Sequence, residues 1–221
     1  MQYIKILKII ILSTIVCLIN SIHVENIRFS SAGVIPRVLI NNKSYLILGK
    51  ETQGIKTGKF DCFCGSRENI ETPWQTASRE FYEESVGALG NLEYYQNLKF
   101  NIKAKIVFFR PNSKIAIDYI VDLNKKQFET LVINFYKNLK KPKLDIVFKE
   151  KSQLALFEEK EVINMIKTST NYQNFKLNAL ILDPIFKIHN SQVQINSFLP
   201  ELLKEYYKNN KINFSTARDF N

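Results

Sequence analysis

The chain has 221 residues, of which 45% are hydrophobic and 24% are charged, and its formal net charge at pH 7 is +10. This apolar fraction is ordinary for a globular protein with a buried core, so the composition excludes wholesale disorder. The longest basic cluster is "KNLKKPK" at residues 137–143, which is typical of a solvated loop or helix end. Charge alone therefore does not indicate nucleic-acid binding, although contact with a polyanion stays open.

Residues 1–23 have the pattern of a secretory signal. Lys5 and Lys8 precede an uncharged apolar run at residues 9–19. That run is too short for an ordinary bilayer span but fits the hydrophobic region of a signal peptide. We expect a periplasmic or secreted protein if the leader is cleaved, and a membrane-anchored one if it is not. A buried N-terminal helix or strand is the third interpretation.

The next segments predict short strands. Residues 32–50 read as two strands joined at Asn41-Asn42, which predicts a hairpin. Pro36 falls within the first strand, and we expect it at a sheet edge or a bulge, because proline donates no ladder hydrogen bond. Residues 59–65 read as one further short strand.

A helix is predicted over Pro73 to Ser85, with Thr72 as its N-cap and Pro73 at its first position. Residues 98–110 and 114–123 alternate or are apolar and are rich in β-branched and aromatic side chains, so they predict two antiparallel strands.

The remaining elements follow the same reasoning. Residues 125–140 and 158–167 predict helices, and residues 153–157 predict a strand between them. We expect the last third to be helical, including residues 197–209, before a polar tail from Asn213. No internal repeat or linker divides the chain. The prediction is an α/β (α+β) domain at residues 30–190, followed by a helical extension and polar tail at residues 191–221.

The helix predicted at residue 73 carries two different flanks. At about 100° per residue, one narrow stripe holds apolar side chains that can pack on a sheet: Trp74, Ala77, Phe81 and Ala88. An adjoining arc holds Glu80, Glu83 and Glu84. The three carboxylates are therefore expected to converge beside the buried face.

This convergence opposes local stability and requires compensation. Glu80 and Glu84 repel at i,i+4, and Glu83 and Glu84 lie near the C-terminal end of the helix, where the macrodipole disfavours anions. A divalent cation such as Mg2+ would compensate, because it takes carboxylate oxygens. Arg79 is a second source of compensation, within reach of Glu83 or Glu71. The alternative is an ordinary solvated face with an arginine pair.

The segment "GSRENIETPWQTASREFYEES" resembles the signature box of the Nudix hydrolases, a multi-position pattern of high specificity. Gly65, Glu71 and the run from Arg79 to Glu84 match its glycine, its spaced acid and its R-E-apolar-x-E-E sequence. The resemblance implies an α/β/α sandwich around a mixed β-sheet. It also implies a metal-dependent hydrolase that cleaves a diphosphate linkage in a nucleoside diphosphate derivative or a related compound.

Two positions depart from the family pattern. Val86 stands where the family usually has glycine, and the glycine follows at Gly87. A helix longer by one residue, ending at Gly87 or Gly90 as the left-handed stop, would absorb this shift. Cys64 precedes Gly65 where the family often has a second glycine, and we expect its thiol to be packed rather than reactive.

The resemblance also implies residue roles. Glu80, Glu83 and Glu84 would hold Mg2+ or Mn2+, and the carbonyl of Gly65 would add a ligand. Glu80 is the first choice for the general base.

Three further residues complete this assignment. Arg79 would orient Glu71. Glu150, in "VFKEKSQ", is a candidate distal base or extra ligand, or else an exposed loop glutamate among lysines.

Other functions stay open at this level. One alternative is a Nudix-fold protein that binds a nucleotide or RNA without turnover. Another is an isoprenoid-diphosphate isomerase, which needs a proton donor in the pocket, with Cys62 or Cys64 as remote candidates. These two cysteines are poorly placed for a mutual bridge, so no structural disulfide is expected. The substrate is expected to be a small diphosphate, nucleotide-derived in the leading interpretation.

Overall fold

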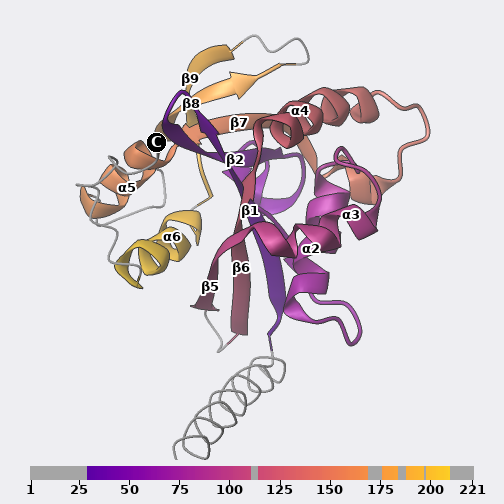
Figure 1. Cartoon of the computed structure of the whole chain (residues 1–221), viewed down its shortest axis with the longest axis horizontal. Coiled ribbons are helices and arrows are strands. Elements are labelled where there is room, and N and C mark those ends of the chain that lie inside the picture. Colours follow the sequence, from indigo (N-terminus) through magenta and orange to yellow (C-terminus); the bar gives the residue numbers. More distant parts are fainter. Residues whose placement is uncertain (1–28, 111–113, 169–175, 184–187, 197, 210–221) are drawn as a thin grey trace, which may run out of the picture.

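The computed structural model describes residues 29–110, 114–168, 176–183, 188–196 and 198–209 (Figure 1). The predicted signal or anchor and the polar tail from Asn213 lie outside these residues. Within the described residues, none of the helices is both long enough and apolar enough to span a membrane.

The described strands are β1 (Ser31–Ile40), β2 (Lys43–Glu51), β3 (Phe60–Asp61), β4 (Phe63–Ser66), β5 (Ile102–Arg110), β6 (Lys114–Leu123), β7 (Lys151–Glu158), β8 (Lys176–Leu182) and β9 (Ile188–Gln194). The described α-helices are α2 (Pro73–Glu84), α3 (Leu92–Asn97), α4 (Lys125–Leu139), α5 (Glu159–Thr168) and α6 (Phe198–Asn209). Short 3-10 turns are η1 (Gly54–Lys56), η2 (Leu98–Asn101) and η4 (Ile146–Lys149).

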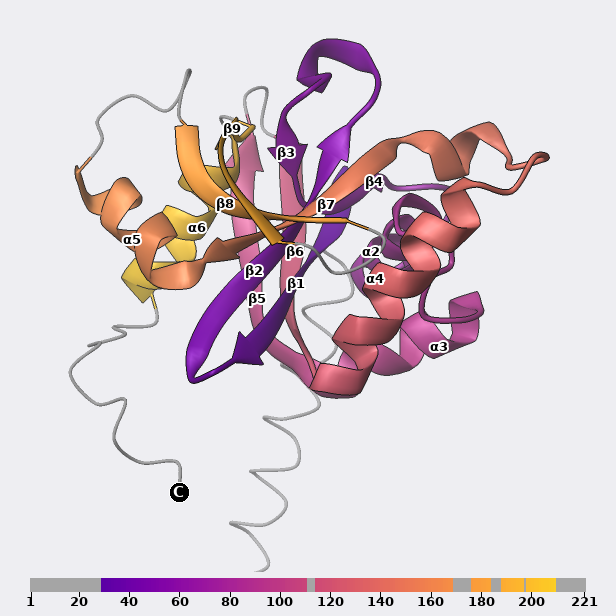
Figure 2. The same cartoon turned by 90° about the horizontal axis from the view of Figure 1, so that it is seen from above.

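One mixed sheet organises these elements, in the order β5-β6-β1-β2-β7-β8-β9. β1 runs parallel to β6 and antiparallel to β2, and the two short strands β3 and β4 pair with β2 and β1. Helices α2, α3 and α4 cover one face, and α5 and α6 cover the other (Figures 1 and 2). The expected fold class, a mixed sheet between helical layers, is confirmed.

Two hydrophobic clusters form the core, one on each face. Adjacent residues of β1 alternate between them: Val34 belongs to the cluster of α2, α3 and α4, and Ile35 to that of α5 and α6. Residues of a strand point alternately to opposite faces, so a strand covered on both faces must be apolar at successive positions. This explains the nearly continuous apolar character of the central strands.

The predicted hairpin is present, and its turn is made by the two asparagines. Asn41 and Asn42 have φ angles of 50° and 60°, and Ile40 pairs with Lys43. Two consecutive left-handed residues define the turn type that joins two-residue hairpins, and asparagine tolerates this conformation.

The expectation for Pro36 was wrong, because β1 is a central strand. β6 follows β1 along one side, whereas on the other side β4 pairs with residues 31–34 and β2 with residues 37–40. Pro36 therefore falls where β1 changes neighbours. A missing N–H group costs little at a position with no ladder partner on that side.

Other local expectations were corrected by the tertiary structure. The strand expected at residues 59–65 is split at Cys62 into β3 and β4, which pair with different neighbours. The last third holds the hairpin of β8 and β9 besides α6, so the expectation of helix there was only partly right. Helix α3 was also not expected.

The remaining predicted elements are confirmed. β5 and β6 are antiparallel neighbours, and α4, β7, α5 and α6 lie at the expected places. Helix α6 contributes Leu202, Leu203 and Tyr206 to the core cluster of α5. Strand β9 crosses residue 190, where the sequence suggested a domain boundary; that division stays a prediction.

Candidate active site

Helix α2 begins as the sequence predicts. Thr72 accepts a hydrogen bond from the backbone N–H of Gln75, and the Gln75 side chain accepts one from the N–H of Thr72, which forms a capping box after which Pro73 opens the helix. Phe81 is buried between Phe63 of β4 and Tyr95 of α3. The centroid of its ring lies 4.9 Å from that of Phe63 and 5.0 Å from that of Tyr95. This packing fixes the rotation of α2, and with it the direction of the glutamate flank.

The end of α2 differs from expectation. The helix is not longer by one residue, because it stops at Glu84 and Val86 itself takes the left-handed conformation, with φ of 61°. Gly87 follows at φ of 60°. A left-handed valine is strained, and the surrounding structure must hold it. The buried hydroxyl of Tyr95 does part of this, since it hydrogen-bonds the Ser85 hydroxyl at 2.6 Å and accepts from the Leu89 N–H at 2.9 Å.

Arg79 is the centre of the glutamate flank. Its guanidinium donates to Glu71 Oε1 at 2.8 Å, to Glu80 Oε1 at 2.8 Å and to Glu83 Oε2 at 3.1 Å. It also donates to the carbonyl of Ser66 at 2.9 Å. Arg79 therefore contacts both of its expected partners, Glu71 and Glu83. We call these four interactions of its guanidinium the Arg79 fork, which links the loop before α2 to the acids on the helix.

Glu71 is held by more than Arg79. Its Oε2 accepts from the Glu68 N–H at 3.0 Å and from the Thr76 hydroxyl at 2.9 Å. Burial acts to raise the pKa of Glu71, but the hydrogen bonds from Arg79, Glu68 and Thr76 outweigh burial and lower it. Glu71 and Arg79 thus hold each other in place, and the expectation that Arg79 orients Glu71 stays a prediction.

Glu80 lies directly against Gly65. A Cβ built on Gly65 would stand 2.3 Å from the carboxyl carbon and both carboxylate oxygens of Glu80. A side chain at position 65 would therefore displace the Glu80 carboxylate from the place it takes in this structure. This contact brings the end of β4 against the acids of α2.

Glu84 points inward from the same flank. Its Oε2 accepts from the Cys64 N–H at 2.8 Å, and its Oε1 lies 3.4 Å from the ammonium of Lys151. Lys151 is fully buried and pairs with Glu51 at 2.6 Å. The acids of α2 therefore have two cationic partners, Arg79 outside and Lys151 inside.

The pKa values of the acids of α2 are raised despite these two cationic partners, mainly because the carboxylates are buried. Burial raises the pKa of Glu80 to about 7, against the lowering effect of Arg79. Burial also raises the pKa of Glu83, and that of Glu84 well above its ordinary value. A cation placed beside these carboxylates would lower all three pKa values.

A cavity of about 410 Å3 opens beside Glu84. Glu150 lines it, together with Cys64, Glu51 and the turn of residues 53–56. The negative charge of Glu150 contributes to the raised pKa values of Glu80 and Glu83, so Glu150 faces the same acids. The structure thus brings all the predicted site residues, Gly65, Glu71, Arg79, Glu80, Glu83, Glu84 and Glu150, to one region.

Among the described residues, Cys62 and Cys64 are free thiols; Cys62 is buried, and the half-buried Cys64 lines this cavity. The ligand atoms of Asp61, Cys62 and Cys64 lie within 4.8 Å of one another. Asp61 is already bound, because its Oδ2 accepts from Lys56 at 2.7 Å and from the Asn196 amide at 2.6 Å. The ammonium of Lys56 is thus a resident cation of this group.

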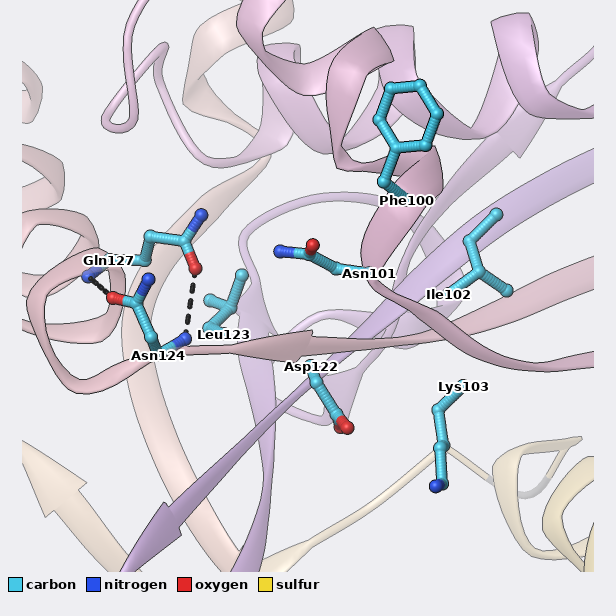
Figure 3. A pocket seen from close by; sticks show the side chains of 8 residues that line it. All are labelled: Phe100, Asn101, Ile102, Lys103, Asp122, Leu123, Asn124 and Gln127. Carbon is cyan, nitrogen blue, oxygen red and sulfur yellow. Dashed lines mark hydrogen bonds between the residues drawn. The ribbon is translucent and has the colours of Figure 1, made fainter.

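A second cavity of about 470 Å3 lies elsewhere, between the start of β5 and the start of α4 (Figure 3). Its amides are largely committed: Asn124 and Gln127 exchange hydrogen bonds that cap α4, and Gln127 also donates to Tyr94. Its acid, Asp122, pairs with Arg37 at 2.6 Å. None of the predicted site residues lines this cavity.

Sequence reasoning missed four charged residues of the region: Glu51, Lys56, Asp61 and Lys151. The chain has 31 lysines and arginines, and no local pattern distinguishes Lys151 from the others. Gly49 is the one indirect signal, because a Cβ there would stand 2.8 Å from Lys151 Cδ, so the glycine makes room for the buried stem.

Comparison with known proteins gives structural likenesses only. No protein-family model and no curated protein matches the chain. A MutT/nudix family protein from Enterococcus faecalis is 12% identical with a TM-score of 0.46, covering 83% of this chain and 63% of that one. A mutT/nudix family protein from Listeria innocua is 14% identical with a TM-score of 0.42, covering 83% and 94%.

An Ap4A hydrolase from C. elegans, in a binary complex, is 16% identical with a TM-score of 0.39, covering 62% of this chain and 83% of that one. The proteins from Enterococcus faecalis and Listeria innocua carry the name of the family that residues 65–85 resemble. Identities this low do not carry an activity from one chain to another.

Proposed function

We propose that the chain is a metal-dependent hydrolase that cleaves a diphosphate linkage in a nucleoside diphosphate derivative or a related compound. The supporting observation is the Arg79 fork, which draws Glu71, Glu80 and Glu83 together beside Glu84 at a cavity. Glu84 lines this cavity, and the side chains of Glu80, Glu83 and Glu84 are 12%, 25% and 3% exposed, so the acids are not spread into bulk solvent. A solvated helix face with an arginine pair does not have this arrangement.

The residues present fit a hard divalent ion. Glu80, Glu83 and Glu84 offer carboxylate oxygens, Gly65 adjoins Glu80 and would add its carbonyl, and such ions take oxygen ligands. Burial is the main reason that the pKa values of the three acids are raised, and a bound cation would lower them. We therefore assign Mg2+ or Mn2+ to this flank.

The roles of the residues follow from their places. A bound ion supplies charge neutralisation of the phosphates and lowers the pKa of a water molecule. Glu80 is the first choice for the base that takes the proton of the attacking water, because Arg79 and Gly65 fix its carboxylate among the acids that would hold the ion. Glu150, on the cavity wall, is the second choice. Arg79 and Glu71 position Glu80 and Glu83.

The test is a screen of the purified chain with Mg2+ or Mn2+ against a panel of diphosphates, with products identified by phosphorus NMR. The panel includes Ap4A and ADP-ribose, because solved structures similar to this chain are of an Ap4A hydrolase and of an NrtR Nudix domain from Shewanella oneidensis complexed with ADP ribose. We expect two phosphorylated products and their loss in Glu83→Gln.

Two other results would overturn the proposal. Tight binding of a nucleotide or RNA without turnover at any metal concentration would make the chain a binding protein. A rearranged product that keeps its diphosphate intact would make it an isomerase, with Cys64 in the cavity wall as a proton donor to test by Cys64→Ser.

We also propose that residues 1–23 serve as a signal or an anchor, on the sequence pattern alone. Mass spectrometry of the chain recovered from its own cells would give a mature N-terminus near residue 24 if the leader is cleaved. An intact leader in a membrane fraction would favour the anchor. An intact leader in the soluble cytoplasmic fraction would contradict both.

A further inference from the structure

Lys151 is a fully buried lysine in a cage of oxygen atoms. Its Nζ lies 2.6 Å from Glu51 Oε1, 3.0 Å from the carbonyl oxygen of Cys62 and 3.4 Å from Glu84 Oε1. Two carboxylates and a backbone carbonyl are also the ligands that a hard metal ion takes. The ammonium group of Lys151 therefore occupies a position whose surrounding oxygen atoms would also suit a metal ion.

The cage is built around this side chain. Lys151 begins β7, Glu51 ends β2, Cys62 lies between β3 and β4, and Glu84 ends α2. The side chains of Glu51 and Glu84 are only 9% and 3% exposed, so water screens their charges weakly. Gly49 leaves the space that the stem of Lys151 fills. Removal of the lysine would leave two buried carboxylates with no cation between them.

The cage and the Arg79 fork divide the acids into two groups. Arg79 bonds Glu80 and Glu83, whereas Glu84 is held by Lys151 and by the Cys64 N–H. Glu51 and Glu84 both line the cavity, so an ion could reach the inner group from solvent. The inner group thus borders the cavity, and the protein itself already supplies it with one positive charge.

We propose that Lys151 fills a second cation site, formed by Glu51, Glu84 and the Cys62 carbonyl, and so takes the place of a divalent ion at the inner end of the active site. This inference rests on the proposed function for the outer metal site. In the wild-type chain Lys151 keeps Glu84 and Glu51 in position beneath the divalent ion proposed for the flank of α2.

The test counts bound Mn2+ by electron paramagnetic resonance in the full chain without substrate. Lys151→Met keeps the length of the stem and removes the charge, so we expect it to bind about one more Mn2+ per chain than wild type. Lys151→Met combined with Glu51→Gln should lose that additional ion. Lys149→Met is the matched control, since it removes an exposed lysine two positions away, and its count should equal that of wild type.

A Mn2+ count for Lys151→Met equal to that of wild type would overturn the proposal. If this variant does not fold without metal, refolding on addition of Mn2+ or Ca2+ supports the proposal, because an ion then replaces the lysine. Lys151→Gln is the second variant, and failure of both variants to fold with or without ions overturns it. These measurements need no turnover, so their outcome does not depend on whether the chain is a hydrolase.

Discussion

The carboxylate of Glu80 occupies the space that a side chain at Gly65 would need, with the built Cβ position 2.3 Å from both of its oxygens. The place that the Glu80 carboxylate takes therefore requires a glycine at position 65, fifteen residues earlier in the chain. The contact also couples the end of β4 to α2. Anything added at position 65 must displace the proposed base and metal ligand.

Gly65→Ala is accordingly expected to weaken divalent-ion binding and activity by about 10–100-fold, the usual cost of disturbing groups around a metal ligand. Calorimetric titration with Mn2+ and the hydrolysis assay measure both effects. Ser66→Ala, at the exposed neighbour whose carbonyl and not its side chain binds Arg79, should leave them unchanged. Wild-type ion affinity in Gly65→Ala would show that Glu80 is not held by this contact.

Arg79→Lys keeps the charge but cannot reproduce the fork that reaches Glu71, Glu80, Glu83 and the Ser66 carbonyl together. We expect a loss of about 1–3 kcal/mol in the free energy of unfolding, from urea denaturation, because charged hydrogen bonds are lost. Activity should fall as Glu80 and Glu83 lose their common anchor. Arg67→Lys, at an exposed arginine over the Phe29 ring, is the control for the substitution itself.

The stability of the ion-free protein should fall as the pH rises from about 5 to 8. Glu80 has a folded-state pKa of about 7, raised from 4.5 by burial, so the folded state binds more protons than the unfolded state between these values. The loss is up to about 3 kcal/mol, at 1.36 kcal/mol per pKa unit. The raised pKa values of Glu83 and Glu84 act in the same direction.

Urea denaturation at several pH values in the presence of a chelator measures this slope. Glu80→Gln should make the fall of stability with pH smaller, because the amide does not titrate. Added Mg2+ should stabilise the wild type more at pH 8 than at pH 5, since the ion binds the deprotonated acids. A profile that rises with pH in the ion-free protein would contradict the assignment.

Tyr95→Phe should destabilise the fold by about 1–3 kcal/mol, because the Ser85 hydroxyl and the Leu89 N–H lose a buried partner. Chemical denaturation measures the effect. Tyr94→Phe, whose hydroxyl lies on the surface and accepts from Gln127, is expected within about 0.5 kcal/mol of wild type. Equal stabilities for the two variants would mean that Tyr95 does not hold the turn after α2.

Local chemistry made much of the site predictable. The cap at Thr72, the apolar stripe through Phe81 and the spacing of Glu80, Glu83 and Glu84 all act within a few turns of one helix. Such features depend on residues close in the chain, so their outcome is readable from the sequence. The Asn41-Asn42 turn is predictable for the same reason.

Tertiary packing decided what the sequence could not. Lys151 and Glu51 are 100 positions apart, and only the pairing of β7 with β2 brings them together in the core. β8 pairs with β7, and β9 pairs with β8, so the sheet continues beyond β7. The sequence of this segment lacks a clear local signal for these two strands. The sequence by itself determined which acids share a flank of α2. The three-dimensional structure decided which cation each acid meets, because charges buried in a core respond to neighbours in space and not along the chain.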